Sequence, residues 1–394
     1  MKLRGVAAIT GVGELKPSRD AEGKTTLGLL AQSASLALRD AGLTKNDIDG
    51  LIVGPPTEDP AFMWPQQVAE YLQLFPSFLD LIEMGGASAT GAIRRAAMAI
   101  ATGQCRHVLC LTGGVWNTGI FNTLEARRAV MSTIEAEFDL PYGPMGFNSA
   151  YALAAQRHMY QYGTKPEQLA KIAVDQRFNA CACPEALFYG HPLTVEEVLS
   201  SPVIVSPLHL FEIVRPCSGA SAVVVSAAEV AKDMPQPPVY ILGTGEFCTH
   251  NSIAQVPDIT VTPIKYSAET AYREAGVSPS DVDFVSVYDC YTITVLLTLE
   301  DAGFCPKGEG GPFVETTDLT YKGKLPCNTH GGQLSWGQPS YAGGMSHVTE
   351  AVRQIRGTAG LRQVKRNELC FVNGNGGALS QQCSLILGKS AHRV

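Results

Sequence analysis

The chain has 394 residues, of which 45% are hydrophobic and 17% are charged, and its formal net charge at pH 7 is −7. This balance is typical of a well-packed globular protein and excludes a disordered chain, while the acidic charge without a basic cluster argues against nucleic-acid binding. No apolar run approaches the roughly 20 residues of a membrane-spanning helix, and residues 1–10 show no apolar signal segment, so we expect a cytoplasmic protein with no membrane partner.

The predicted elements at the start of the chain alternate between strands and helices. A strand over Val6–Thr10 leads to a helix over about Leu27–Ala41, whose alanines and leucines supply an apolar face, and then to a strand over Gly50–Val53. A second helix runs through Ala92–Ala101, and a strand over His107–Leu111 follows it. This alternation predicts parallel strands covered by helices.

A glycine-rich turn precedes the second of these helices. Gly85, Gly86 and Gly91 surround Ser88, which lies where the helix is expected to begin. A helix N-terminus offers unpaired N–H groups and the positive end of the helix dipole to a developing anion. Ser88 is therefore placed either to cap the helix or to act as a nucleophile, and this stretch alone favours the cap.

The segment 115–207 resembles neither of its flanks. It contains two predicted helices, over 150–163 and 166–179, and a polar irregular stretch, and an insertion of this kind usually forms a lid or a substrate-binding face. Its aromatic residues are Trp116, Phe121, Phe138, Tyr142 and Phe147, among others. They fit either a sizeable apolar substrate or a lid that packs on its own domain.

The eleven cysteines are most simply reduced thiols. The one close pair, Cys181 and Cys183, lacks the second pair that a zinc site needs. We therefore predict no metal site, and no tightly bound cofactor.

The first half of the chain is repeated. Pro238–Glu246 restates Val6–Glu14 at an offset of 232 residues, and Gly276 restates Gly42, at the end of the following helix, at an offset of 234. A change of two residues is what a difference in loop length leaves behind. The repeat predicts a duplicated βαβα unit, with the linker between the halves at Asp233–Pro238.

Several motifs of the chain resemble those of the thiolase superfamily, and within it the sterol carrier protein x-type thiolases. The resemblance runs along nearly the whole chain and rests on His191–Val198 in place of the segment "DPLTVEDVL", Tyr288–Tyr291 in place of "HDCF", Gly337–Pro339 in place of "GHP", and Gly374–Gly377 in place of the terminal glycine loop. It implies duplicated βαβαβαββ halves that form a five-layered α-β-α-β-α core with an inserted loop domain.

The resemblance also implies the domain boundaries and the assembly. Residues 1–114 and 208–237 would form the N-terminal half, 115–207 the loop domain and 238–394 the C-terminal half. A homodimer would form through the strand that follows the Ser88 helix, about His107–Leu111.

The departures from the thiolase pattern concern the catalytic positions. Ser88 stands where thiolases have the nucleophilic cysteine, Gln338 replaces the histidine of "GHP", and Tyr288 replaces the histidine of "HDCF". The second catalytic cysteine has no counterpart, since Val372 and Asn373 occupy that place. Thiolase chemistry needs a thiolate that forms and later expels an acyl group, so ordinary Claisen condensation and thiolysis are not expected.

The chain resembles most the cysteine-less branch of the superfamily, which consists of aldolases that cleave side chains from steroid-like acyl-CoA substrates with a small partner carrying an OB-fold and a zinc ribbon. This implies a carbon–carbon lyase that performs a retro-aldol step on a β-hydroxyacyl-CoA, with coenzyme A as part of the substrate. Tyr341 together with Tyr288 or Tyr291 is the predicted acid–base pair, although Tyr291, where the family has phenylalanine, fits a packed aromatic slightly better.

Two other functions remain open. An acyltransferase or condensing enzyme would use Ser88, or a nucleophile from a partner, with His330 or Tyr341 as the nearest base by motif. A non-catalytic subunit would bind acyl-CoA or act as a scaffold. Asp289 is expected to be a structural hydrogen-bond acceptor or, if buried near the reaction, the base. The residues predicted to contact the CoA-linked substrate are Gly331, Gly332, Gln338 and Gly376.

Overall fold

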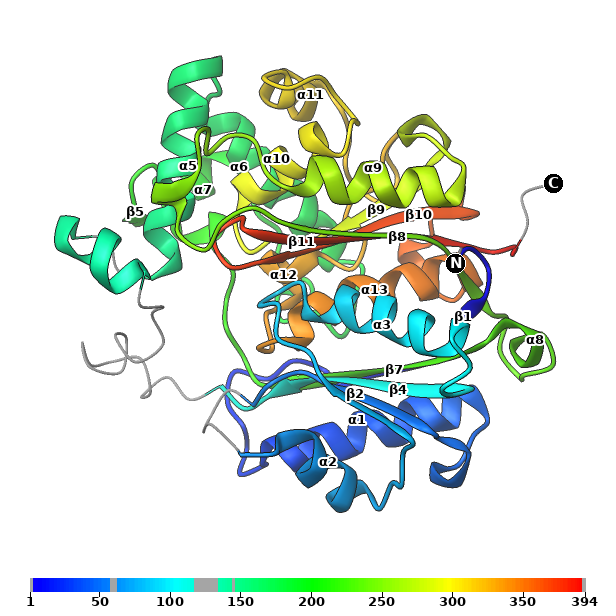
Figure 1. Ribbon diagram of the computed structural model, residues 1–394. Helices are drawn as coiled ribbons and strands as arrows, with labels where there is room; N and C mark the ends of the chain where they lie inside the picture. The colour runs from blue at the N-terminus through cyan, green and yellow to red at the C-terminus, as the bar shows by residue number, and fades with distance from the viewer. Residues whose placement is uncertain (1–2, 57–61, 117–133, 144–145, 392–394) are drawn as a thin grey trace.

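The computed structural model of the chain describes residues 3–56, 62–116, 134–143 and 146–391. Its elements lie in five layers, with the helices α3 and α13 between two layers of strands and further helices on both outer faces (Figure 1). The predicted five-layered α/β arrangement is confirmed.

Each half supplies one layer of strands. The N-terminal half consists of β1 (Ala7–Glu14), α1 (Thr26–Ala41), β2 (Gly50–Val53), α2 (Trp64–Leu72), β3 (Phe78–Leu81), α3 (Ser88–Ala101), β4 (His107–Gly114), β7 (Gly219–Ala227) and α8 (Ala228–Ala231). The C-terminal half consists of β8 (Val239–Cys248), α9 (Ile264–Ala275), β9 (Phe284–Val287), α10 (Thr292–Asp301), α11 (Gly310–Thr316), α12 (Gly332–Trp336), α13 (Ala342–Arg356), β10 (Leu369–Gly376) and β11 (Gln381–Gly388).

The strands form one continuous sheet in the order β3-β2-β4-β7-β1-β8-β11-β10-β9. The two halves are joined where β1 pairs with β8, through Ala8 with Tyr240 and Ile9 with Val239. The sheet is mixed and not purely parallel, since β1, β7, β8 and β11 run antiparallel to their neighbours, whereas β3, β2 and β4 are parallel, as are β9 and β10.

The repeat is visible in how the outer helices pack on the central strands. A side chain on Gly13 would collide with the carbonyl oxygen of Ser33 in α1, and one on Gly245 would collide with that of Ser267 in α9. The glycines are 232 residues apart and the serines 234. The two-residue difference therefore lies in the connection from strand to helix, as predicted, and glycine lets each helix lie directly on its strand.

The labelled helices of the inserted segment lie over the C-terminal half, although the segment interrupts the N-terminal half in sequence (Figure 1). It contains α5 (Phe147–Tyr162), α6 (Pro166–Ala180), α7 (Val195–Ser200) and β5 (Val203–Val205), and β5 pairs with β6 (Leu208–His209). Helix α6 packs against α10, α11 and α12. A buried hydrogen bond anchors α5, because His158 Nε2 lies 3.1 Å from the Glu300 carboxylate.

Three of the aromatic residues predicted to matter in the insertion are exposed. They are Phe138, Tyr142 and Phe147, and these three side chains therefore do not pack a lid onto its own domain. Tyr151 of α5, by contrast, is buried. Phe121 lies outside the described residues.

Strand β4 cannot carry the expected dimer contact. It pairs with β2 on one side and with β7 on the other, so it has no free edge. The prediction that copies join through His107–Leu111 is wrong, because the apolar character of this strand reflects burial in the middle of a sheet. The edge strand of this half is β3.

In the part of the chain that the structure describes, no helix is both long enough and apolar enough to cross a membrane.

Candidate active site

Three glycine turns meet at the N-terminal ends of α3 and α13. A side chain on Gly86 would collide with the phenol of Tyr288 and the carbonyl oxygen of Asn375, and one on Gly344 would lie 2.5 Å from the Gly86 oxygen. Gly85 faces the terminal glycine loop, with the Gly377 nitrogen 3.0 Å from where its Cβ would be. Because these positions are glycines, the turn before α3 can contact the start of α13, the loop after β9 and the loop after β10.

Ser88 is the first residue of α3 and does not cap it, since the N-cap is Ala87. Its side chain is buried, and its Oγ accepts a hydrogen bond from the N–H of Met84 at 2.9 Å. The hydroxyl thus closes the turn that precedes the helix. Among the described residues, no histidine or carboxylate is recorded as a hydrogen-bond partner of Ser88, so the geometry shows no base that would activate it.

Tyr288 lies at the centre of the convergent turns. Its side chain is buried, and Gln338 Nε2 donates a hydrogen bond to its oxygen at 3.2 Å. Burial raises the pKa of Tyr288 above its usual value, and the nearby Tyr341 is among the groups that raise it further. The phenol is therefore neutral at pH 7, and its hydrogen can be donated to a group that enters the site.

Tyr341 ends the turn before α13 and points to the opposite half. Its hydroxyl donates to the Glu83 carboxylate, 3.0 Å from Oε2 and 3.3 Å from Oε1. Burial raises the pKa of Tyr341, and the adjacent Glu83 charge raises it further. Glu83 was missed in the sequence, where its only signal is its place two residues after β3 and two before the glycine pair.

Tyr291 is held in an aromatic and polar cluster of its own. Its ring stacks on Tyr151, with centroids 4.1 Å apart and planes inclined by 21°, and its hydroxyl donates to Asn148 Oδ1. Tyr151, which the sequence did not indicate, donates to the Gly377 carbonyl at 2.8 Å. This geometry favours a packed aromatic over a member of the acid–base pair.

Asp289 is buried and serves the start of α12. Its carboxylate accepts the N–H groups of Gln333 at 2.8 Å and Leu334 at 3.1 Å, and His347 Nε2 lies 3.1 Å away. These contacts occupy both oxygens. The position fits a structural acceptor and leaves little capacity for a base.

His330 and the glycines beside it are also enclosed. His330 Nε2 lies 3.2 Å from Ser346 Oγ, and burial lowers the pKa of this histidine well below its usual value. A side chain on Gly332 would collide with the Asp289 carboxylate, one on Gly331 would lie 2.6 Å from Ala180, and one on Gly376 would collide with a backbone oxygen of the turn before α3. These glycines are required by close packing, and their contact with a CoA-linked substrate stays a prediction.

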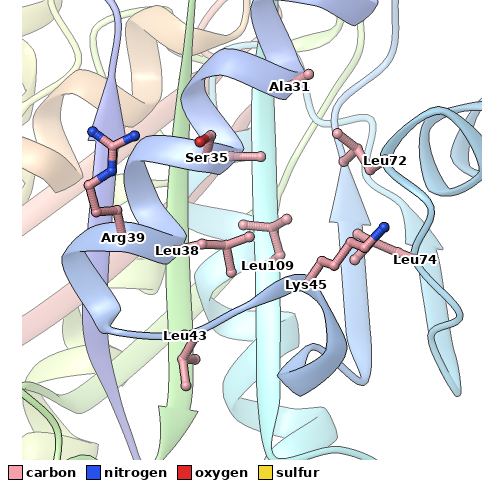
Figure 2. Close-up of a pocket in the computed structure, with 10 residues that line it drawn as sticks. Ala31, Ser35, Leu38, Arg39, Leu43, Lys45, Leu72, Leu74 and Leu109 are labelled. Atoms are coloured by element: carbon pink, nitrogen blue, oxygen red, sulfur yellow. The ribbon is translucent and has the colours of Figure 1, made fainter.

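A pocket of about 420 Å³ lies elsewhere, on the outer face of the N-terminal half. Side chains from α1 and the segment after it, from the C-terminal end of α2 and from β4 surround it (Figure 2). Leucines and alanines dominate its lining, and its ionisable groups are Arg39 and Lys45. Without a carboxylate, histidine or tyrosine in its lining, it offers no acid–base pair.

Comparison with known proteins identifies the family of this chain. Residues 245–389 match the family described as Thiolase C-terminal domain-like. The chain is 33% identical to the steroid side-chain-cleaving aldolase of Thermomonospora curvata, over 91% of this chain and 92% of that one. The chain belongs to the thiolase superfamily.

Other members of the thiolase superfamily agree with this assignment. The 17-hydroxy-3-oxo-4-pregnene-20-carboxyl-CoA lyase of Mycobacterium tuberculosis is 32% identical over 91% of this chain and 93% of its own. Among solved structures, a chain of the Ltp2-ChsH2(DUF35) aldolase superposes with a TM-score of 0.87 at 33% identity, covering 98% of both chains. Human mitochondrial 3-ketoacyl-CoA thiolase, at 14% identity and a TM-score of 0.71, shares the fold.

Proposed function

We propose that this chain is a carbon–carbon lyase that cleaves a β-hydroxyacyl-CoA with a bulky, steroid-like acyl group by a retro-aldol reaction. The observation that carries the proposal is the pair Tyr288 and Tyr341, two protonated phenols on opposing turns where thiolases have cysteine–histidine chemistry. The names of the two relatives, an aldolase and a CoA lyase, support the same reaction class and a CoA-linked substrate.

The two phenols suit the two charges that the reaction moves. Cleavage removes the proton from the β-hydroxyl group and transfers the electron pair of the carbon–carbon bond toward the thioester carbonyl. Tyr288, whose oxygen already accepts from Gln338, would donate its hydrogen to the enolate that forms. Tyr341, whose hydroxyl donates to the Glu83 carboxylate, would receive the hydroxyl proton.

The acyltransferase alternative has one observation in its favour. An acetyl-CoA acetyltransferase of Methanothermobacter thermautotrophicus is 32% identical over 89% of this chain. Against it, the Ser88 hydroxyl is buried and bonded to the Met84 amide. The scaffold alternative is disfavoured because the replaced positions carry polar phenol and amide groups that hydrogen-bond to one another.

The assembly is part of the proposal. The name of the Ltp2-ChsH2(DUF35) aldolase records a partner of that protein, and it supports a partner for this chain, for which we propose a small OB-fold and zinc-ribbon protein.

We also propose a homodimer and a cytoplasmic location. The eleven free cysteines suit a reducing compartment such as the cytoplasm. Fractionation of the producing cell would test the location.

The proposal is tested by mass spectrometry of products. The purified chain, alone and with a candidate OB-fold partner, is incubated with a β-hydroxyacyl-CoA that carries a bulky ring system. We expect a ketone or aldehyde and a shortened acyl-CoA, and Tyr341→Phe should reduce the rate about 100-fold or more.

The matched control is Tyr71→Phe, a half-exposed tyrosine on α2, which should leave the rate unchanged. Tight acyl-CoA binding without cleavage would support the scaffold instead. An acyl mass on the peptide that contains Ser88 would support the acyltransferase.

A further inference from the structure

We propose that Glu83 is the final acceptor of the β-hydroxyl proton and receives it through the hydroxyl group of Tyr341. The inference rests on the proposed lyase function and assigns the base of that reaction. Glu83 acts through Tyr341 and need not touch the substrate.

The Glu83 carboxylate is oriented from both sides. Its Oε1 accepts the N–H of Gly85 at 2.9 Å, which ties the side chain to the turn before α3. The Tyr341 hydroxyl donates to both carboxylate oxygens from the turn before α13. Among the described residues, no lysine or arginine forms an ion pair with Glu83, so no cation neutralises the charge of the Glu83 carboxylate. The carboxylate is free to take a proton.

A tyrosine at this position cannot serve as the base alone. A phenol has an ordinary pKa of about 10, and the surroundings of Tyr341 raise it further, so almost no phenolate exists at neutral pH. A neutral phenol accepts a proton only if it gives up its own at the same time. The hydrogen bond to Glu83 provides that exit.

The other ionisable groups on these turns are already engaged or enclosed. Asp289 accepts two backbone N–H groups at the start of α12. His330 is buried against Ser346, and Tyr291 donates to an amide oxygen and not to a carboxylate. Of the three tyrosines predicted from the motifs, Tyr341 is the one whose hydroxyl is hydrogen-bonded to a carboxylate.

The proposed step balances as follows. The β-hydroxyl proton passes to Tyr341 Oη while the Tyr341 hydrogen passes to a Glu83 oxygen. The carbon–carbon bond breaks, its electron pair forms the enolate of the thioester, and the β-carbon becomes a carbonyl group. The enolate takes a proton at carbon from water, and Glu83 then returns its proton through Tyr341 to the hydroxide ion that this leaves. No oxidant or reductant is required.

The decisive variant is Glu83→Gln, because glutamine keeps an oxygen that can accept from Gly85 and from Tyr341 and removes only the charge. With a bulky-ring β-hydroxyacyl-CoA as the probe, we expect kcat to fall about 10²–10⁴-fold. The KM for the probe should stay near the wild-type value, because Glu83 acts through Tyr341 and need not touch the substrate. The double variant with Tyr341→Phe should be hardly slower than either single variant, since both interrupt one path.

Two further variants separate the relay from a structural role. Glu83→Asp restores a carboxylate and should recover part of kcat with KM unchanged. Glu70→Gln, on the exposed face of α2, should change neither kcat nor KM. If the wild type cleaves the probe and Glu83→Gln keeps the wild-type kcat, the relay is wrong and the lyase function stands. If the wild type does not cleave it, the lyase function falls and the relay with it.

Discussion

At the scale of single residues, the buried carboxylate of Glu350 shows how surrounding partners stabilise a charge. Glu350 of α13 is fully buried and accepts from Arg362 at 3.0 and 2.8 Å and from Thr329 at 2.6 Å. Burial alone would raise the pKa of Glu350, but the Arg362 guanidinium outweighs it and lowers the pKa from 4.5 to about 2. Glu350 lies in α13, which follows Tyr341, and Arg362 lies in the turn after that helix, so the pair helps to hold the helix in place.

This pair makes stability depend on pH in one direction. Because the folded pKa lies below the unfolded one, its contribution, about 3 kcal/mol, is present above pH 4.5 and is lost as the pH falls toward 2. Glu350→Gln leaves Arg362 unpaired and should lower the free energy of unfolding at pH 7 by about 3–5 kcal/mol. In urea titrations, the difference from the wild type should narrow as the pH falls below about 4.5.

Glu269→Gln is the matched control for this prediction. Glu269 pairs with Arg273, and both side chains are 68% exposed. Its loss should cost less than about 0.5 kcal/mol. An equal cost for the two variants would show that burial does not strengthen the Glu350 pair.

At the scale of elements, helices meet strands and turns at glycines. In each half the outer helix rests on the central strand at a glycine, and the site itself is assembled from turns that approach at Gly86 and Gly344. Because the backbones already touch, an added methyl group has no space. The elements must then move apart, which costs packing energy.

The element contact most open to test is that of α9 with β8. In Gly245→Ala the new methyl would collide with the Ser267 carbonyl, so we expect a loss of at least about 1–3 kcal/mol in the free energy of unfolding. Gly28→Ala changes the first turn of α1, where the added Cβ would lie 3.3 Å from the nearest atom, Thr25 Oγ1. This variant should be neutral or stabilising. Equal stabilities in thermal unfolding would contradict this account of the packing.

At the scale of the whole molecule, one sheet spans both halves and leaves β3 at an edge. Edge strands carry unpaired backbone groups that can pair with another chain. Leu81 at the end of β3 is 44% exposed, although it is apolar. We therefore assign the proposed homodimer contact to β3.

Light scattering tests this assembly. The wild type should have about twice the chain mass of 42.0 kDa, and Leu81→Lys should shift it toward the mass of one chain. Leu361→Lys, at an 81% exposed leucine in a turn, should not change the mass. A wild-type monomer, or a dimer that survives Leu81→Lys, would contradict the assignment.

Three features could be predicted from the sequence: the duplicated halves, the elements with their approximate bounds and the loss of the cysteine and histidine positions. The first two follow from local patterns, because apolar periodicity and glycine placement are set by neighbours along the chain, whereas the third follows from the resemblance to thiolase motifs. The contact of Glu83 with Tyr341, the stacking of Tyr291 on Tyr151 and the interior position of β4 are visible in the tertiary structure alone. The two side-chain contacts join residues more than 100 positions apart, and all three features depend on how the layers pack, which no local pattern records.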